Sequence, residues 1–166
     1  MISLSDETKN IQNPALGGYL LSKFANEYYN NSDKFPALQL LFVAYPLIYI
    51  NDLSEIIGST NKPTGLRGCM DKLKEKKNSK NDIVLHIQTS IINNKPQIMD
   101  SIRLATASGL ISIDKTGEVI PLPDRIKRIK VSSKDIEKLQ KVSEKLGIWF
   151  SDLSLIEISQ ILKVRF

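Results

Sequence analysis

The segment from Leu38 to Ile50 constrains the fold of this chain more than any other part of its sequence. Almost every residue in it is apolar, and a helix that is hydrophobic on all sides is normally buried inside a protein. The run is shorter than the roughly 18 to 20 apolar residues that a membrane-spanning helix needs. Pro36 can open such a helix, and Pro46 is expected to kink or end it. The sequence therefore predicts a buried core helix in a chain of 166 residues, a length that suits one domain.

Apolar residues at helical spacing predict further helices on both sides of this segment. The first has Asn13 as its N-cap and Pro14 at its first position, and it is expected to end near Tyr29. The other predicted helices span 53–57, closed by Gly58; 65–76; 83–109, in two parts or kinked at Pro96; 132–147, ended by Gly147; and 153–166.

Residues 110–121 carry the clearest strand signal. Two short apolar segments, 110–113 and 118–121, flank a turn that contains glycine. A helix that runs straight into a hairpin is typical of a winged helix-turn-helix. We therefore predict a mostly α (α+β) fold over 13–166, a compact helical domain with a small β-hairpin that is winged helix-turn-helix-like, preceded by a flexible arm at 1–12.

Residue types that commonly carry catalysis or bind metals are scarce. Cys69 is the only cysteine and His86 the only histidine, so the chain can form neither an internal disulfide nor a Cys/His zinc site. We interpret His86, which lies among isoleucines at helical spacing, as a structural or surface residue, with catalysis as the alternative. The two glycines of residues 64–68 lack the phosphate-binding loop pattern. The expectation is a protein that is not an enzyme and has no cofactor and no metal.

Positive charge is concentrated in two clusters. The formal net charge is +5, and residues 62–80 alone hold seven basic residues against two acidic ones. Clustered cations can contact nucleic-acid phosphates, although a solvated helix face is the alternative. The candidate contacts to double-stranded DNA are Lys72, Lys74, Lys76, Lys77 and Lys80 in the first cluster and Arg125, Lys127, Arg128 and Lys130 in the second.

The C-terminal stretch 146–166 is unusually apolar for the end of a chain. Chain ends normally fray, so such a stretch is expected to pack on its own domain or on a partner. The candidate partner interface comprises Asn13, Pro14, Trp149, Phe150, Leu155, Ile158 and Phe166. The other end of the chain has neither the basic start nor the apolar run of a signal peptide, so we expect a cytoplasmic protein with no membrane partner.

Several local patterns together resemble the middle components of bacterial three-component ABC-ATPase systems. They are Asn13-Pro14-Ala15-Leu16, Phe35-Pro36-Ala37-Leu38-Gln39-Leu40-Leu41-Phe42, Tyr45-Pro46-Leu47, Thr64-Gly65-Leu66-Arg67 and Leu146-Gly147-Ile148-Trp149-Phe150 followed by Leu162-Lys163-Val164-Arg165. The resemblance spans about 13–166, and it departs at Ile148, where members tend to have a basic or small residue. These middle components are similar in gene context to the third subunit of Lamassu-type systems, which act against phage and plasmids.

The resemblance implies a non-catalytic accessory subunit that sits with an SMC-like or Rad50-like ATPase and an effector, often a nuclease. This is the leading hypothesis for the chain. The alternative is a stand-alone winged-helix DNA-binding transcription regulator, motivated by the hairpin and its adjacent basic residues. An enzyme is a third and more distant reading.

Overall fold

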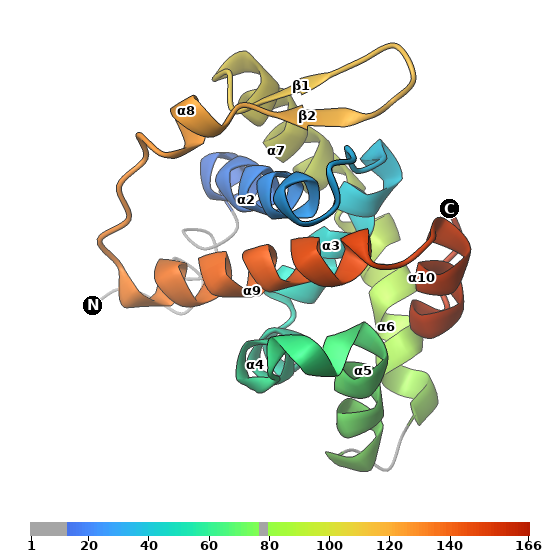
Figure 1. Ribbon diagram of the computed structural model, residues 1–166. Helices are drawn as coiled ribbons and strands as arrows, with labels where there is room; N and C mark the ends of the chain where they lie inside the picture. The colour runs from blue at the N-terminus through green and yellow to red at the C-terminus, as the bar shows by residue number, and fades with distance from the viewer. Residues whose placement is uncertain (1–12, 77–79) are drawn as a thin grey trace.

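Helix α3, Leu38–Tyr49, lies in the core of the fold, as its apolar sequence predicts (Figure 1). The computed structural model describes residues 13–76 and 80–166. In chain order its elements are α2 (Pro14–Ser32), α3, α4 (Asn51–Ser59), the 3-10 turn η1 (Lys62–Thr64), α5 (Gly65–Lys76), α6 (Lys80–Asn93), α7 (Lys95–Ala107), β1 (Ile111–Ile113), β2 (Val119–Pro121), α8 (Pro123–Ile126), α9 (Lys134–Ser151) and α10 (Leu155–Leu162). The predicted class, mostly helical with a small hairpin, is confirmed. The predicted arm at 1–12 lies outside the described residues.

The ends of α3 differ from the prediction. The helix begins at Leu38 rather than near Pro36, because the backbone at 36–38 pairs with the hairpin: Val119 N–H donates to Pro36 O and Leu38 N–H to Gly117 O, each at 2.9 Å. Pro46 does not end the helix, which continues to Tyr49. The N–H of Ile50 donates to Pro46 O at 2.9 Å and closes the last turn.

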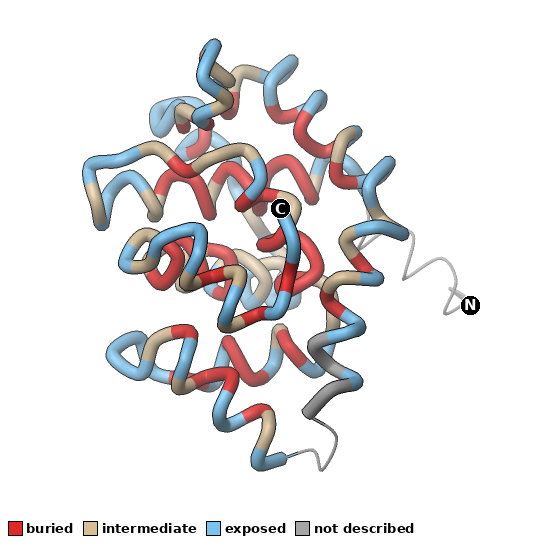
Figure 2. The backbone as a smooth tube through the Cα atoms, turned by 90° about the vertical axis from the view of Figure 1, so that its right-hand side faces the viewer, coloured by how far each residue is buried: buried red, intermediate tan, exposed pale blue. Residues whose placement is uncertain are grey.

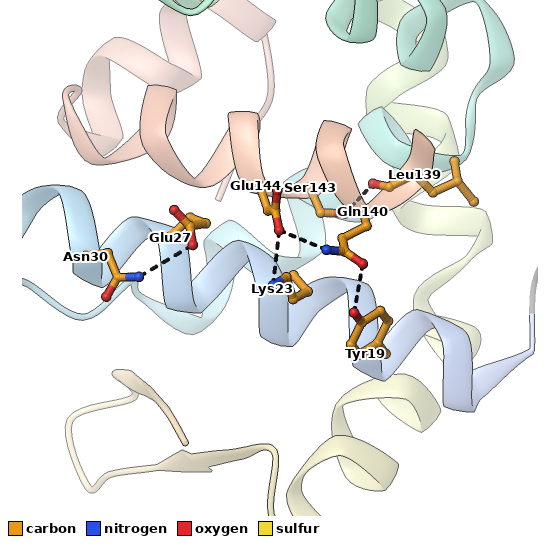
Figure 3. A network of polar contacts seen from close by, with 8 residues as sticks. All are labelled: Tyr19, Lys23, Glu27, Asn30, Leu139, Gln140, Ser143 and Glu144. Atoms are coloured by element: carbon orange, nitrogen blue, oxygen red, sulfur yellow. Dashed lines mark hydrogen bonds and ion pairs between the residues drawn. The ribbon is translucent and has the colours of Figure 1, made fainter. Parts of the chain in front are cut away.

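Helices α2 and α9 form the most extensive helix pair, and they run in the same direction. Tyr19 near the start of α2 donates to Gln140 of α9 at 2.8 Å, and Asn31 near its end donates to Ser151 at 2.8 Å. Lys23 bridges to Glu144 at 3.0 Å between these points (Figure 3). The residues that this parallel pair brings together are about 120 positions apart in the sequence, so the fold depends on long-range contacts.

Gly147 explains why this pair packs so closely. The predicted helix end at Gly147 is wrong, because α9 continues through it to Ser151. A Cβ atom at Gly147 would collide with the backbone carbonyl of Phe24 and approach the backbone nitrogen of Tyr28. Only glycine allows the two backbones this approach, which also brings the rings of Phe24 and Phe150 to 5.4 Å in a T-shaped arrangement.

The remaining helices follow the predicted periodicity with shifted ends. Helix α5 has the predicted bounds, and the segment predicted as one kinked or two consecutive helices forms two, α6 and α7. Helix α4 is longer than predicted and includes Gly58. Helix α10 is shorter than the predicted 153–166. Ser154 caps its start in a reciprocal pair with Glu157, and Lys163, with a left-handed φ of 54°, ends it. Helix α8 was not predicted.

The hairpin has the predicted position and an antiparallel register, with Ile111 opposite Pro121 and Ile113 opposite Val119. Asp114 holds its turn by accepting from the backbone N–H groups of Thr116 and Glu118 at 2.8 and 3.0 Å. The hydrogen bond from the Thr116 hydroxyl, together with these backbone bonds, lowers the pKa of Asp114 below its ordinary value. The hairpin packs on α2 and α7 (Figure 1).

Within the described ranges, no single helix is long and apolar enough to cross a membrane. Helices α3 and α4 pass such a test only as a pair, and they are bent by 92° relative to each other. Most of α3 is buried in the protein. Figure 2 shows that the other helices carry buried residues alternating with exposed ones.

Candidate functional site

The single histidine and the single cysteine lie in different surroundings on different helices. His86 is exposed on α6, whereas Cys69 is fully buried on α5, where burial raises the pKa of its thiol. Among residues 13–76 and 80–166, no group of three or more His, Cys, Asp or Glu side chains could hold a metal ion. The structure therefore directs attention to surfaces that could bind another macromolecule.

The apolar C-terminal stretch divides into a buried part and an exposed part. Trp149, Phe150 and Ile158 are buried within the chain's own core, so on the folded chain these three candidate interface residues are not open to a partner. Trp149 additionally donates from Nε1 to the carbonyl oxygen of Lys62 at 2.9 Å. Leu155 and Phe166, by contrast, are 41% and 52% exposed.

Sequence reasoning did not single out three other exposed apolar residues, Leu85 and Ile92 on α6 and Ile156 on α10, although Ile156 lies within the predicted apolar stretch 146–166. Their exposed fractions are 67%, 64% and 70%. The backbone N–H of Arg165 donates to Gln88 at 2.9 Å and so holds the C-terminal tail against α6, between the positions of Leu85 and Ile92. We name Leu85, Ile92, Leu155, Ile156 and Phe166 the C-terminal face; Figure 2 views the side on which the chain ends.

The signal that identifies the α6 part of this face was available in the sequence. Leu85 and Ile92 are seven residues apart and therefore share one side of the helix. Ile87 is buried and Ile91 partly buried on another side. An α6 that is apolar on two sides can bury only one of them within this chain.

A lysine of α9 anchors the chain between α4 and α5. Lys145 Nζ donates to the carbonyl oxygens of Ile57, Gly58 and Thr60 at 2.9, 2.9 and 2.7 Å. It also lies 5.9 Å from the centroid of the Trp149 ring. Burial lowers the pKa of Lys145, while three converging carbonyl oxygens match the donors of its charged form. Sequence patterns gave no sign of this contact, because Lys145 resembles an ordinary solvated lysine.

The two predicted basic clusters lie on separate parts of the molecule. In the first, Lys72 and Lys76 are exposed on α5 and Lys74 lies 3.8 Å from Asp71. Lys77 lies outside the described residues, and only the backbone of Lys80 is described. The second cluster, which we name the α8 ridge, comprises the exposed residues Arg125, Lys127, Arg128 and Lys130. Figure 1 shows α5 and α8 at opposite ends of the fold, so the clusters do not form one continuous surface.

The surface formed by the described residues carries several hollows. One of about 800 Å³ lies between α4 and the first half of α9. Two smaller ones, about 430 and 350 Å³, lie beside the connection between α8 and α9, and Ile129 lines both. Asn13 and Pro14 are exposed at the start of α2, where the side chain of Asn13 accepts from the Leu16 N–H at 2.7 Å.

Comparison with known proteins gives one match. The model of a protein family described as ABC-three component (ABC-3C) system Middle Component 3 matches residues 1–166. No curated protein and no solved structure matches the chain.

Proposed function

The chain belongs to the Middle Component 3 family of ABC-three component systems, and from this membership we propose that it is a non-catalytic subunit that docks onto its ATPase through the C-terminal face. The observation that carries the proposal is the exposure of five large apolar side chains on α6, α10 and the C-terminal tail. Burying one such side chain contributes about 1.5 to 3 kcal/mol. A partner that covers several of them would remove this apolar surface from water, which favours association.

The resemblance of the sequence supports a more specific assignment. We propose that the ATPase is SMC-like, as in Lamassu-type systems, and that the subunit links it to an effector, often a nuclease, in bacterial defence against phage or plasmids. Asn13 and Pro14 remain candidates for a second contact, because both are exposed at the start of α2.

Exchange of Ile156 for glutamate tests the docking surface. Ile156→Glu is expected to weaken capture of the ATPase by about tenfold or more, because a carboxylate would be buried against an apolar partner surface. Co-purification of the full chain with the other two components of its system measures this, with Leu85→Glu as a second variant on α6. The matched control is Gln39→Glu, which adds the same charge at an exposed position on α3.

If wild type captures neither component, the proposed function is wrong. Equal capture by Ile156→Glu, Leu85→Glu and the control would instead reject the C-terminal face as the contact. Because Ile156 and Leu85 are both exposed, neither exchange should lower the stability of the folded chain by more than about 0.5 kcal/mol.

A second function, contact with the backbone of double-stranded DNA, is favoured by the cations of α5. Lys72 and Lys76 are exposed, and neither has a carboxylate within 4.0 Å among the described residues. This surface would serve a winged-helix-like regulator acting alone or a subunit of a DNA-bound complex. The hairpin that directly follows α7 is the structural feature in common with winged-helix domains.

Charge reversal on α5 tests the DNA contact. Lys72→Glu combined with Lys76→Glu is expected to weaken binding to a labelled DNA duplex by about tenfold and to flatten its dependence on salt, because fewer counterions are released. Fluorescence anisotropy at several salt concentrations measures both effects. Unchanged affinity would show that this helix does not touch DNA.

A further inference from the structure

An open apolar pocket lies beside the α8 ridge. It has a volume of about 350 Å³ and is enclosed by the start of α2, the last turns of α7 and the connection after α8. Leu104, Leu110 and Ile129 contribute apolar surface, and Leu104 and Ile129 are themselves exposed. Arg125 and Arg128 of the α8 ridge line the same pocket. Two guanidinium groups therefore border an apolar hollow.

Gly109 leaves room for one of these guanidinium groups. Its φ of 71° lies in the left-handed region, where glycine is favoured, and it ends the turn after α7. A Cβ atom at this position would lie 3.4 Å from both Cζ and Nη1 of Arg125. The Arg125 side chain thus lies over the bare backbone of Gly109 and is also exposed to solvent.

The positive charge at the pocket has no ion-pair partner among the described residues. No member of the α8 ridge has a carboxylate within 4.0 Å among the residues that the structure describes. Other basic side chains do have such partners, among them Lys23 with Glu144 and Arg67 with Glu157. Asp124 is the single acid between Pro123 and Lys130. The ridge therefore presents a net positive charge to any ligand of the pocket.

The combination of apolar and cationic surface distinguishes between two classes of partner. Protein–DNA interfaces are strongly positive but polar, whereas the surface here interleaves arginine with exposed leucine and isoleucine. Arginine and apolar residues are typical of protein interfaces, and a guanidinium group can bind a carboxylate with two parallel hydrogen bonds. A nucleic-acid backbone would leave Leu104 and Ile129 without an apolar partner.

We propose that this pocket binds an acidic segment of a partner protein, with one large apolar side chain inserted between α7 and the α8–α9 connection and flanking carboxylates on Arg125 and Arg128. The identity of the partner as another component of the same system rests on the proposed function. The chemical class of the ligand does not rest on the proposed function, because it follows from the charges and the lining residues of the pocket alone. This surface is also distinct from the C-terminal face, so one subunit could contact two partners at once.

A peptide titration tests this proposal without a known partner. The probe is a labelled peptide of aspartate and glutamate with one central phenylalanine, added to the full chain and followed by fluorescence anisotropy. Arg125→Glu with Arg128→Glu is expected to weaken binding by about tenfold or more, and replacing the phenylalanine by serine should have a similar effect. Leu104→Ser, at an exposed pocket residue, should also weaken it. The control Lys72→Glu with Lys76→Glu makes the same charge change on α5 and should leave peptide binding unaltered.

Each alternative outcome overturns the proposal in a recognisable way. Equal binding of the phenylalanine and serine peptides would reduce the site to a charge patch. Tighter binding of a short DNA duplex through the same two arginines would assign the ridge to nucleic acid, and no saturable binding of any probe would reject the site. The single exchange Arg128→Glu guards against loss of folding from disturbing Arg125 on Gly109. If the chain failed to co-purify with the other components but still bound the peptide, only the proposed function would be rejected.

Discussion

Replacing Trp149 by alanine is expected to lower the free energy of unfolding by about 3 to 5 kcal/mol. The side chain is only 2% exposed, and removing it would leave a cavity between α9 and the connection from α4 to α5. It would also leave the carbonyl oxygen of Lys62 without its Nε1–H donor. Urea unfolding followed by far-UV circular dichroism measures the change, since helix content does not depend on the tryptophan itself.

The variant Trp149→Phe separates the two contributions. Phenylalanine retains most of the buried aromatic surface and removes the donor, so its cost should be about 1 to 2 kcal/mol, well below that of alanine. Wild-type stability of the Trp149→Ala variant would contradict the structure. If Trp149→Ala kept wild-type stability but failed to capture the ATPase, the indole would be an interface residue rather than part of the core.

The sequence could predict which segments form helices, but not which helices pack against each other. Apolar residues at helical spacing predicted both α2 and α9 as helices, and four of these residues, Leu20, Phe24, Val142 and Leu146, are buried. Nothing local indicates that these two helices lie side by side and parallel. That arrangement depends on Gly147. In the sequence Gly147 resembles a residue that ends a helix, whereas in the fold it is the point at which the backbones of α2 and α9 meet.

The candidate site, like the fold, could be predicted only in part from the sequence. Charge is a property of composition, so both basic clusters were predicted as surface, and every side chain in them that the structure describes is exposed or partly exposed. Whether an apolar residue is exposed, by contrast, cannot be predicted from its neighbours in the sequence. Helix α10 is apolar on more than one side, and only its position against the domain decides that Ile158 is buried while Ile156 is 70% exposed. The apolar pocket at the α8 ridge was likewise unpredictable, because its lining comes from three separate segments.

Lys145 illustrates the same limit and leads to the second large effect. Lys145→Met keeps the length of the side chain and removes its ammonium group, which is expected to lower the free energy of unfolding by about 2 to 3 kcal/mol. The cost arises because three carbonyl oxygens at the end of α4 lose a charged donor. Water can replace it only in part, since two of the three hydrogen bonds are partly buried. Urea unfolding of the variant and wild type measures the difference.

The matched control is Lys141→Met, one turn earlier on α9, where the lysine is exposed and a change of less than about 0.5 kcal/mol is expected. Equal stability of the two variants would mean that the contact of Lys145 with α4 contributes nothing. The double variant Lys145→Met with Trp149→Phe gives a sharper test, because both side chains donate from α9 to the same connection between α4 and α5. If they hold it jointly, the two costs should not add, since after the first loss the connection has already loosened and the second donor has less to stabilise.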